Sequence, residues 1–170
     1  MGKTDSLTRF KVALATLLAT RSLTQVTVQD LVRKAGVDRS TFYRHFLNFE
    51  DFLSWLENDM LTEITQQVEH DDNDSLDFTK FYIYAANHQV VLKAFLENKR
   101  IPDLTNRLKD IVAKKYHQLL LTQTSSIPPA IQAEFLIGGH IALITWWLQQ
   151  KNPPCAQTMA IYHRQLSQPR

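Results

Sequence analysis

Six hydrogen-bonding side chains lie within seven consecutive residues near the N-terminus, and their types suit binding to a nucleic acid. They are Arg39, Ser40, Thr41, Tyr43, Arg44 and His45. Guanidinium, hydroxyl and imidazole groups hydrogen-bond to phosphate oxygens and to base edges in the major groove. Phe42 stands among them, and Phe46 follows one helical turn later. At this spacing both rings can anchor one face of a helix while the polar side chains occupy the other.

A turn centred on Gly36 separates this segment from the residues before it. Glycine takes the left-handed conformation that ends a helix without a Cβ clash. Thr27 can cap the preceding helix, with Asp30 at the third position close to the capping-box pattern, so a helix is predicted over residues 28–34. Asp38 can cap a second helix of about two turns. Two short helices around a glycine turn, the second one polar on its outer face, predict a helix-turn-helix that reads DNA.

Residues 27–52 resemble the signature of the tetracycline-repressor (TetR) family of bacterial transcriptional regulators. The matching set, in order, is Thr27, Leu31, Ala35, Gly36, Val37, Ser40, Thr41, Tyr43, His45, Phe46, Asn48 and Glu50. The likeness is close over about the first third of the chain and looser over residues 135–166, which resemble the family's dimerisation helices. The chain departs from the family at Leu47 and Phe49, where lysines are usual, so two of the family's phosphate contacts are in question. The resemblance implies a homodimer that binds a pseudo-palindromic operator in double-stranded DNA and responds to a small-molecule effector.

The expected DNA contacts divide into two groups. Base edges are expected to meet Arg39, Ser40, Thr41 and, more weakly, Gln29. Phosphates are expected to meet Thr27, Tyr43, Arg44 and His45. Any one of these residues taken alone would also fit a solvated surface.

The composition favours an all-α protein whose positive charge is concentrated at one end. The chain has 170 residues with only 4 Gly and 6 Pro, which suits helices throughout. Its net charge is only +2, but residues 1–45 hold eight Lys or Arg against three acids, while the remainder has more acids than bases. Phosphate attraction requires such a distribution, although ordinary surface charge would also produce it. The single Cys155 excludes an internal disulfide and suits a reducing compartment.

Apolar periodicity and breaks predict about nine helices in two regions. The expected helices cover residues 4–21, 28–34, two turns after Asp38, 48–68, 75–87, 89–98, 103–123, 130–150 and 155–167. The first three form a helix-turn-helix DNA-binding domain over residues 1–47, and residues 48–170 form a helical ligand-binding and dimerisation domain. The acidic stretch 70–74 lacks the glycine and distal Glu of a calcium loop and is expected to be a solvated linker.

The last two helices are expected to form a four-helix interface with those of a second subunit. The eighth is apolar on most sides and carries Gly138 and Gly139, which cost a helix roughly 1 kcal/mol each and suggest close helix contact. The expected interface residues are Phe135, Gly138, Gly139, Ala142, Trp146, Met159, Tyr162 and Leu166. The alternative is an internal core helix of a monomer.

A small-molecule pocket, implied by the resemblance, is placed in the region of residues 75–150. Its candidate lining consists of Phe78, Tyr82, Phe95, Tyr116, His117, His140 and Trp146. Aromatic residues at helical spacing also fit an ordinary hydrophobic core, and that alternative stays open.

Several other classes of function are excluded or less favoured. The sequence has no phosphate loop, no zinc spacing and no nucleophile elbow, so neither an enzyme, a metal site nor a cofactor is expected. The N-terminus does not read as a signal peptide, and the apolar stretch 135–148 is shorter than the roughly 20 residues that span a bilayer, so a cytoplasmic protein is expected. The competing interpretation is an all-α protein-interaction module or co-regulator without an effector pocket. Nothing in the residues separates a repressor from an activator.

Overall fold

The computed structural model describes residues 3–69, 78–97, 106–107, 109–110, 113 and 126–167. Over these residues every regular element is helical, which confirms the predicted all-α class. The elements are α1 (Lys3–Leu18), the short 3-10 helix η1 (Leu23–Gln25), α2 (Val28–Ala35), α3 (Arg39–Tyr43), α4 (Phe49–Glu69), α5 (Phe78–Asn87), α6 (Gln89–Glu97), α8 (Pro129–Gln149) and α9 (Ala156–Ser167). The acidic stretch 70–74 and most of the helix predicted over 103–123 lie outside the described residues.

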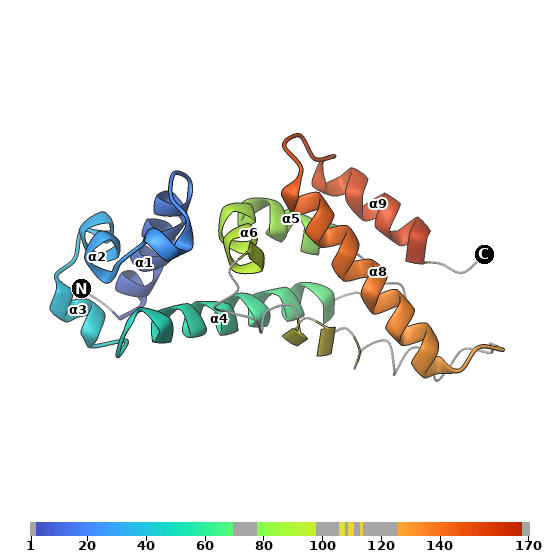
Figure 1. Ribbon diagram of the computed structural model, residues 1–170, viewed down its shortest axis with the longest axis horizontal. Helices are drawn as coiled ribbons and strands as arrows, with labels where there is room; N and C mark the ends of the chain where they lie inside the picture. The colour runs from blue at the N-terminus through green and yellow to red at the C-terminus, as the bar shows by residue number, and fades with distance from the viewer. Residues whose placement is uncertain are drawn as a thin grey trace.

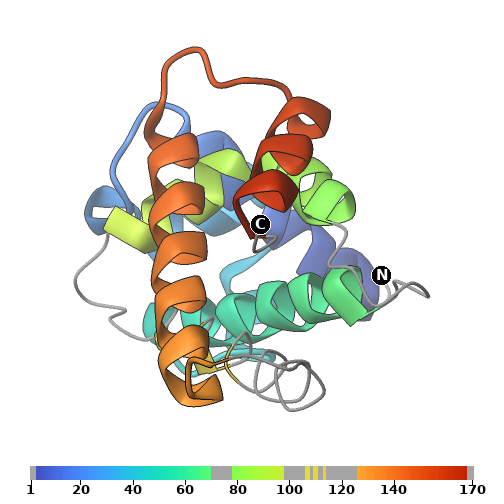
Figure 2. The same ribbon diagram turned by 90° about the vertical axis from the view of Figure 1, so that its right-hand side faces the viewer.

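The helices are arranged along one long axis (Figure 1). α1, α2 and α3 form a bundle at one end, and the 21-residue α4 runs from α3 along the length of the molecule. α1 packs on α2 and α6, α4 packs on α5, and α5 packs on α9. Figure 2 looks onto the other end, where α8 and α9 lie across the face turned to the viewer. The polar segment of α3 and the α8–α9 pair therefore lie at opposite ends of the chain.

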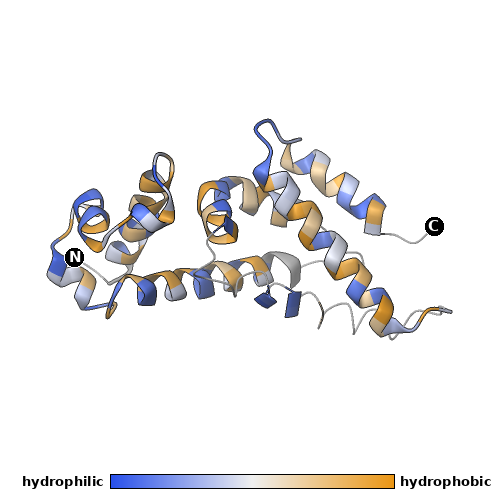
Figure 3. Ribbon diagram, viewed as in Figure 1, coloured by the Kyte–Doolittle hydropathy of each residue, from blue (hydrophilic) through white to orange (hydrophobic). Residues whose placement is uncertain are grey.

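One hydrophobic core runs from the N-terminal bundle through α4 and α5 to α8 and α9. Phe10 and Leu14 of α1 are fully buried, as the apolar spacing of this helix predicts. Phe52 and Leu56 on α4 continue the core. Figure 3 shows the result on α4, with hydrophobic residues on its inner side and hydrophilic ones on its outer side.

α1 and α4 are also joined by an ionic contact along their outer edge. The ammonium of Lys11 on α1 binds the carboxylates of Asp59 and Glu63 on α4, the latter at 3.5 Å. The same ammonium lies 5.5 Å from the ring centroid of Trp55, also on α4. This contact ties the N-terminal bundle to the helix that leads into the body.

α3 is shorter than predicted, because it spans five residues rather than two full turns. Beyond Tyr43 the chain turns, and the amides of His45 and Phe46 both donate to the Phe42 carbonyl, at 2.9 and 3.0 Å. Asp38 is the N-cap residue, but its side chain makes no capping hydrogen bond, so the predicted side-chain cap is corrected. α3 is therefore held mainly by its buried rings.

Candidate nucleic-acid interface

Four phenylalanine rings fix α3 against the N-terminal bundle. Phe10, Phe42 and Phe52 are fully buried, and Phe46 is 5% exposed. The ring centroids are 5.6 Å apart for Phe10–Phe42, 5.4 Å for Phe42–Phe46 and 5.2 Å for Phe46–Phe52, in edge or tilted geometries that aromatic pairs prefer. The predicted pair of anchoring rings is confirmed, with α1 and α4 contributing the other two.

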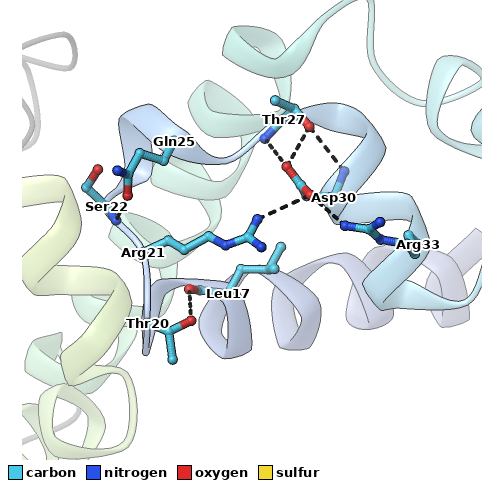
Figure 4. A network of polar contacts seen from close by, with 8 residues as sticks. All are labelled: Leu17, Thr20, Arg21, Ser22, Gln25, Thr27, Asp30 and Arg33. Carbon is cyan, nitrogen blue, oxygen red and sulfur yellow. Dashed lines mark hydrogen bonds and ion pairs between the residues drawn. The ribbon is translucent and has the colours of Figure 1, made fainter.

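The N-terminus of α2 is fixed by a capping box that extends into an ion-pair network (Figure 4). The Asp30 amide donates to Thr27 Oγ1 at 3.2 Å, and Asp30 Oδ2 accepts from the Thr27 amide at 3.3 Å and from the Thr27 hydroxyl at 2.7 Å. Asp30 Oδ1 binds Arg21 at 3.2 Å and Arg33 at 2.9 Å. The hydrogen bond from the Thr27 hydroxyl, assisted by Arg21, holds the pKa of the Asp30 carboxyl below its usual value. The predicted cap is confirmed. The Thr27 hydroxyl donates its proton to the Asp30 carboxylate.

Gly36 ends α2 in the left-handed conformation, with φ 66° and ψ 40°. Its amide donates to the Arg33 carbonyl at 3.3 Å, and the Val37 amide donates to the Val32 carbonyl at 3.1 Å. A side chain at this φ would be strained, so the turn requires glycine. The predicted turn is confirmed, and it sets α3 at an angle to α2.

The outer side of α3 carries four exposed polar residues: Arg39, Ser40, Tyr43 and Arg44. Thr41 is half-buried, and Gln29, near the start of α2, is exposed. Arg39 Nη2 donates to the Tyr43 hydroxyl at 3.1 Å, and Arg44 Nη2 donates to Thr41 Oγ1 at 3.4 Å. These side chains are free to meet a ligand outside the protein, as DNA reading requires.

His45 differs from these residues because it is half-buried and tied to α1. Its Nε2 is 2.9 Å from Oγ of Ser6, a residue that is only 3% exposed. Its ring also meets Phe10 edge-on, with centroids 6.4 Å apart. The position of His45 is therefore set by contacts with α1. The sequence did not indicate the contact with Ser6, because the two residues lie far apart in the chain.

The seven basic residues of the N-terminal bundle whose side chains the structure describes fall into two groups. Four of them bind carboxylates of the protein itself: Arg9 to Asp5, Lys11 to Asp59 and Glu63, and Arg21 and Arg33 to Asp30. Lys34, Arg39 and Arg44 have no ion-pair partner among the residues that the structure describes. Two of these three cations are at α3, so the positive charge that remains available for phosphate lies on the predicted reading face.

The junction between α3 and α4 carries the departures from the TetR pattern. The Asp51 amide donates to Asn48 Oδ1 at 2.8 Å, and the Leu47 amide donates to Asp51 Oδ2 at 2.8 Å, so the predicted cap at Asn48 is confirmed. Leu47 is 84% exposed, and the ring of Phe49 packs on Phe52 at 5.9 Å. Neither side chain can bind a phosphate by charge.

At the opposite end, α8 and α9 expose a stripe of apolar side chains. Phe135 is 80% exposed, Trp146 49%, Tyr162 49% and Leu166 72%. Gly138, Gly139 and Ala142 are exposed on the same side of α8. Met159 is different: it is 2% exposed and packs in the core, so its assignment to the surface stripe is corrected. Met159 belongs to the hydrophobic core, and α9 packs on α5.

α8 also has the length and hydropathy of a membrane-crossing helix, with 21 residues and a mean hydropathy of 1.2. The sequence expectation that no segment was long enough is corrected to this extent. Core helices of water-soluble proteins meet the same criterion, and α8 packs on α6 and α9 within the chain.

The described residues of the predicted effector pocket mostly lie in the core. Phe78, Tyr82, Phe95 and His140 are all less than 9% exposed. This burial agrees with the alternative that these residues form ordinary hydrophobic core. Trp146 is 49% exposed and so lies outside this core, and its assignment to a pocket stays a prediction. Tyr116 and His117 lie outside the described residues.

A buried polar cluster joins α5, α8 and α9, and it includes His163, which sequence reasoning missed. His163 is fully buried, its ring is stacked on Phe78 with centroids 3.7 Å apart, and its Nδ1 is 2.9 Å from the Tyr82 hydroxyl. Its Nε2 forms a short hydrogen bond with Nδ1 of His140. Neutral rings satisfy both bonds: the Tyr82 hydroxyl donates to one nitrogen of His163, and the other nitrogen donates to His140. Burial lowers the pKa of His140 to about 4 and, with help from His140, that of His163 to about 3.

Two helices joined by a glycine turn display cations that have no ion-pair partner among the described residues, and the rest of the described chain is helical. This arrangement is that of a helix-turn-helix DNA-binding regulator. Residues 12–54 match the family model described as bacterial regulatory proteins, tetR family. This match assigns residues 12–54 to the DNA-binding domain of TetR-family transcriptional regulators.

Comparisons over the whole chain agree with this assignment. The chain is 29% identical over 167 residues to YhgD of Bacillus subtilis strain 168, an uncharacterized HTH-type transcriptional regulator, covering 84% of this chain and 86% of YhgD. A TetR transcriptional regulator from Streptococcus agalactiae shares the fold with a TM-score of 0.67 at 19% identity, over 98% of this chain and 96% of that one. NalD of Pseudomonas aeruginosa, the secondary repressor of the MexAB-OprM multidrug efflux pump, gives a TM-score of 0.66 at 15% identity, over 95% and 93% of the two chains. These relatives are regulators of transcription rather than enzymes.

Proposed function

We propose that the chain acts as a homodimer that binds a pseudo-palindromic operator through its two α3 helices. The observation that carries this proposal is the pair Gly138–Gly139 on α8. Glycine inside a helix costs roughly 1 kcal/mol relative to alanine, yet a Cβ at either position would meet no described atom of the protomer within 4 Å. Packing on the described residues of the protomer therefore does not explain the glycines, but they would allow the backbone of a partner helix to approach closely.

The apolar stripe around the glycines supports the same interface. Phe135, Trp146, Tyr162 and Leu166 present large apolar side chains to the outside, and a partner's α8 and α9 would cover them in a four-helix arrangement. A twofold axis at this end places one α3 in each half of the dimer. Such dimers bind half-sites about 34 Å apart, one turn of DNA, and so select a symmetric site.

On DNA, we assign the residues of α2 and α3 two kinds of contact. Arg39, Ser40, Thr41 and Gln29 contact base edges. Tyr43, Arg44 and His45 contact phosphates, together with Thr27, whose amide and hydroxyl are already engaged by Asp30. The exposure of Gln29, Arg39 and Ser40, and the absence of an ion-pair partner for Arg39 and Arg44 among the described residues, support this division.

We further propose that the chain represses transcription in the cytoplasm and is released from its operator by a small molecule bound in the helical body. NalD, which shares the fold, is a repressor. The cluster of Tyr82, His140 and His163 offers hydrogen-bonding groups within an apolar core, as effector pockets require. Thermal unfolding against a metabolite panel tests this part, and a lack of stabilisation by every compound would contradict it.

The dimer is tested by light scattering coupled to size-exclusion chromatography. Phe135→Glu places a charge on the stripe and should give a monomer, whereas Ile83→Glu, at an apolar residue of α5 that is 40% exposed, should leave the dimer intact. The monomeric variant should also lose affinity for an operator obtained by selection. A wild-type monomer, or equal effects of the two substitutions, would refute the proposed interface.

A further inference from the structure

Arg39 is the first residue of α3 and is held by an aromatic side chain rather than by a carboxylate. Its Nη2 donates to the Tyr43 hydroxyl at 3.1 Å, and its guanidinium carbon lies 5.4 Å from the centroid of the Tyr43 ring. No described carboxylate forms an ion pair with it. The guanidinium therefore keeps its full charge while its orientation is restricted.

The Tyr43 side chain is itself positioned by contacts with buried aromatic rings. Its ring meets that of Phe42 edge-on, with centroids 5.5 Å apart and an interplanar angle of 89°, and Phe42 is fully buried. Phe42 in turn packs on Phe10. A continuous line of rings thus connects the core of the N-terminal bundle to the guanidinium at the surface, so Arg39 is positioned before any ligand binds.

A restricted guanidinium suits one base in particular. Its parallel N–H groups match the O6 and N7 acceptors of guanine in the major groove, and this bidentate pair is the commonest specific contact of arginine with DNA. Preorganisation reduces the side-chain entropy that is lost when the pair forms. Arg44 lacks such support, because the only described hydrogen bond of its guanidinium is the 3.4 Å contact with Thr41.

We propose that Arg39 reads a guanine in each half-site of the operator and that Tyr43 is the positioning residue that aims it. This inference rests on the proposed function, since it names the base that the reading helix recognises. The Tyr43 hydroxyl accepts from Arg39 and keeps its own proton to donate to a phosphate oxygen, so one side chain joins the backbone contact to the base contact.

The test is selection of bound duplexes from a random pool with the full-length wild-type protein, followed by affinity measurements on the selected duplex and on one with the guanine replaced. The wild type should select a guanine at symmetric positions and discriminate by roughly 10- to 100-fold against its replacement. Arg39→Ala should abolish this discrimination, and Arg39→Lys, which cannot form the planar fork, should lose most of it.

Variants of Tyr43 separate positioning from a plain phosphate contact. Tyr43→Leu should reduce discrimination nearly as far as Arg39→Ala does, and Tyr43→Phe should reduce it partly. In the Arg39→Ala background, both Tyr43 substitutions should weaken all duplexes alike, without further loss of discrimination. Arg44→Ala is the matched control, expected to weaken binding to all duplexes equally and to leave the selected sequence unchanged. Thermal unfolding of each variant establishes that it is folded.

The outcomes distinguish this inference from the proposed function. Selected duplexes without a symmetric guanine, or a guanine preference that survives Arg39→Ala, would overturn the reading role. Discrimination that is unchanged in Tyr43→Leu would overturn the positioning role. Failure of the wild type to enrich any duplex would instead refute operator binding itself, and the guanine reading with it.

Discussion

The buried histidine pair makes the stability of the fold depend on pH between about 7.5 and 4. His140 and His163 have pKa values of about 4 and about 3 in the folded chain, below the value of about 6.5 in an unfolded one. The unfolded state therefore binds more protons than the native state as the pH falls through 6.5. The contribution of the neutral pair to the free energy of unfolding is fully present above about pH 6.5. It is lost progressively as the pH falls toward the folded pKa values.

The magnitude follows from the two shifts. At pH 5 each histidine is largely protonated in the unfolded chain and neutral in the folded one, which favours unfolding by about 2 kcal/mol per residue. We expect the free energy of unfolding to fall by about 4 kcal/mol between pH 7.5 and pH 5 from these two residues. Such a loss is a large part of the stability of a typical domain.

Urea unfolding followed by circular dichroism, at one protein concentration and several pH values, measures this loss. The double variant His140→Gln/His163→Gln should lose about 4 kcal/mol less than the wild type over the same range, whatever its stability at neutral pH. Tyr82→Phe is the control: it removes the hydrogen bond to His163 but keeps the burial that mainly lowers both pKa values, so its pH dependence should resemble that of the wild type. The reasoning is wrong if the free energy of unfolding of the double variant decreases with falling pH as steeply as that of the wild type. It is also wrong if NMR shows either ring of the folded wild type protonated near pH 6.

Three further predictions concern the N-terminal bundle, one of them with a comparison variant in α8, and each is checked by urea unfolding. Thr27→Val removes the side-chain cap of α2 and should cost about 1 kcal/mol, and an unchanged midpoint would argue against the capping box. Gly36→Ala should lower the free energy of unfolding by about 1 kcal/mol because φ is +66° there. Gly138→Ala should instead stabilise α8 when it is measured at a concentration where the chain is monomeric. Lys11→Met should cost about 1 kcal/mol by leaving Asp59 and Glu63 without this cation, and Asp59→Asn should cost much less in that background than in the wild type.

The local features of the reading site were predictable because they depend on residues close together in the chain. The i, i+4 rings of Phe42 and Phe46, the Thr27–Asp30 box and the Gly36 turn each follow from spacing and backbone preference, and the structure confirms them. The shortness of α3 was not predictable in this way, since the chain turns after Tyr43 to bring Phe46 under the bundle.

Contacts between distant residues could not be read from local spacing. His45 meets Ser6 across 39 residues, and His163 meets Tyr82 across 81. Periodicity alone held one clue to His163, because Ala156, Met159, Ala160 and His163 recur at helical spacing and are all buried. That stripe would have placed His163 inward and identified Met159 as a core residue.

The internal pairing of Arg9, Lys11, Arg21 and Arg33 affects how the protein searches a genome. Among the bases of the N-terminal bundle whose side chains the structure describes, three in each protomer have no ion pair, and if all six in a dimer met phosphates of non-specific DNA they would give a log–log salt slope of about −5. Proteins with steeper slopes are held strongly by any stretch of chromosome. Weak retention on bulk DNA would leave a larger share of the molecules available to the operator at low copy number, so occupancy would depend on base recognition more than on charge.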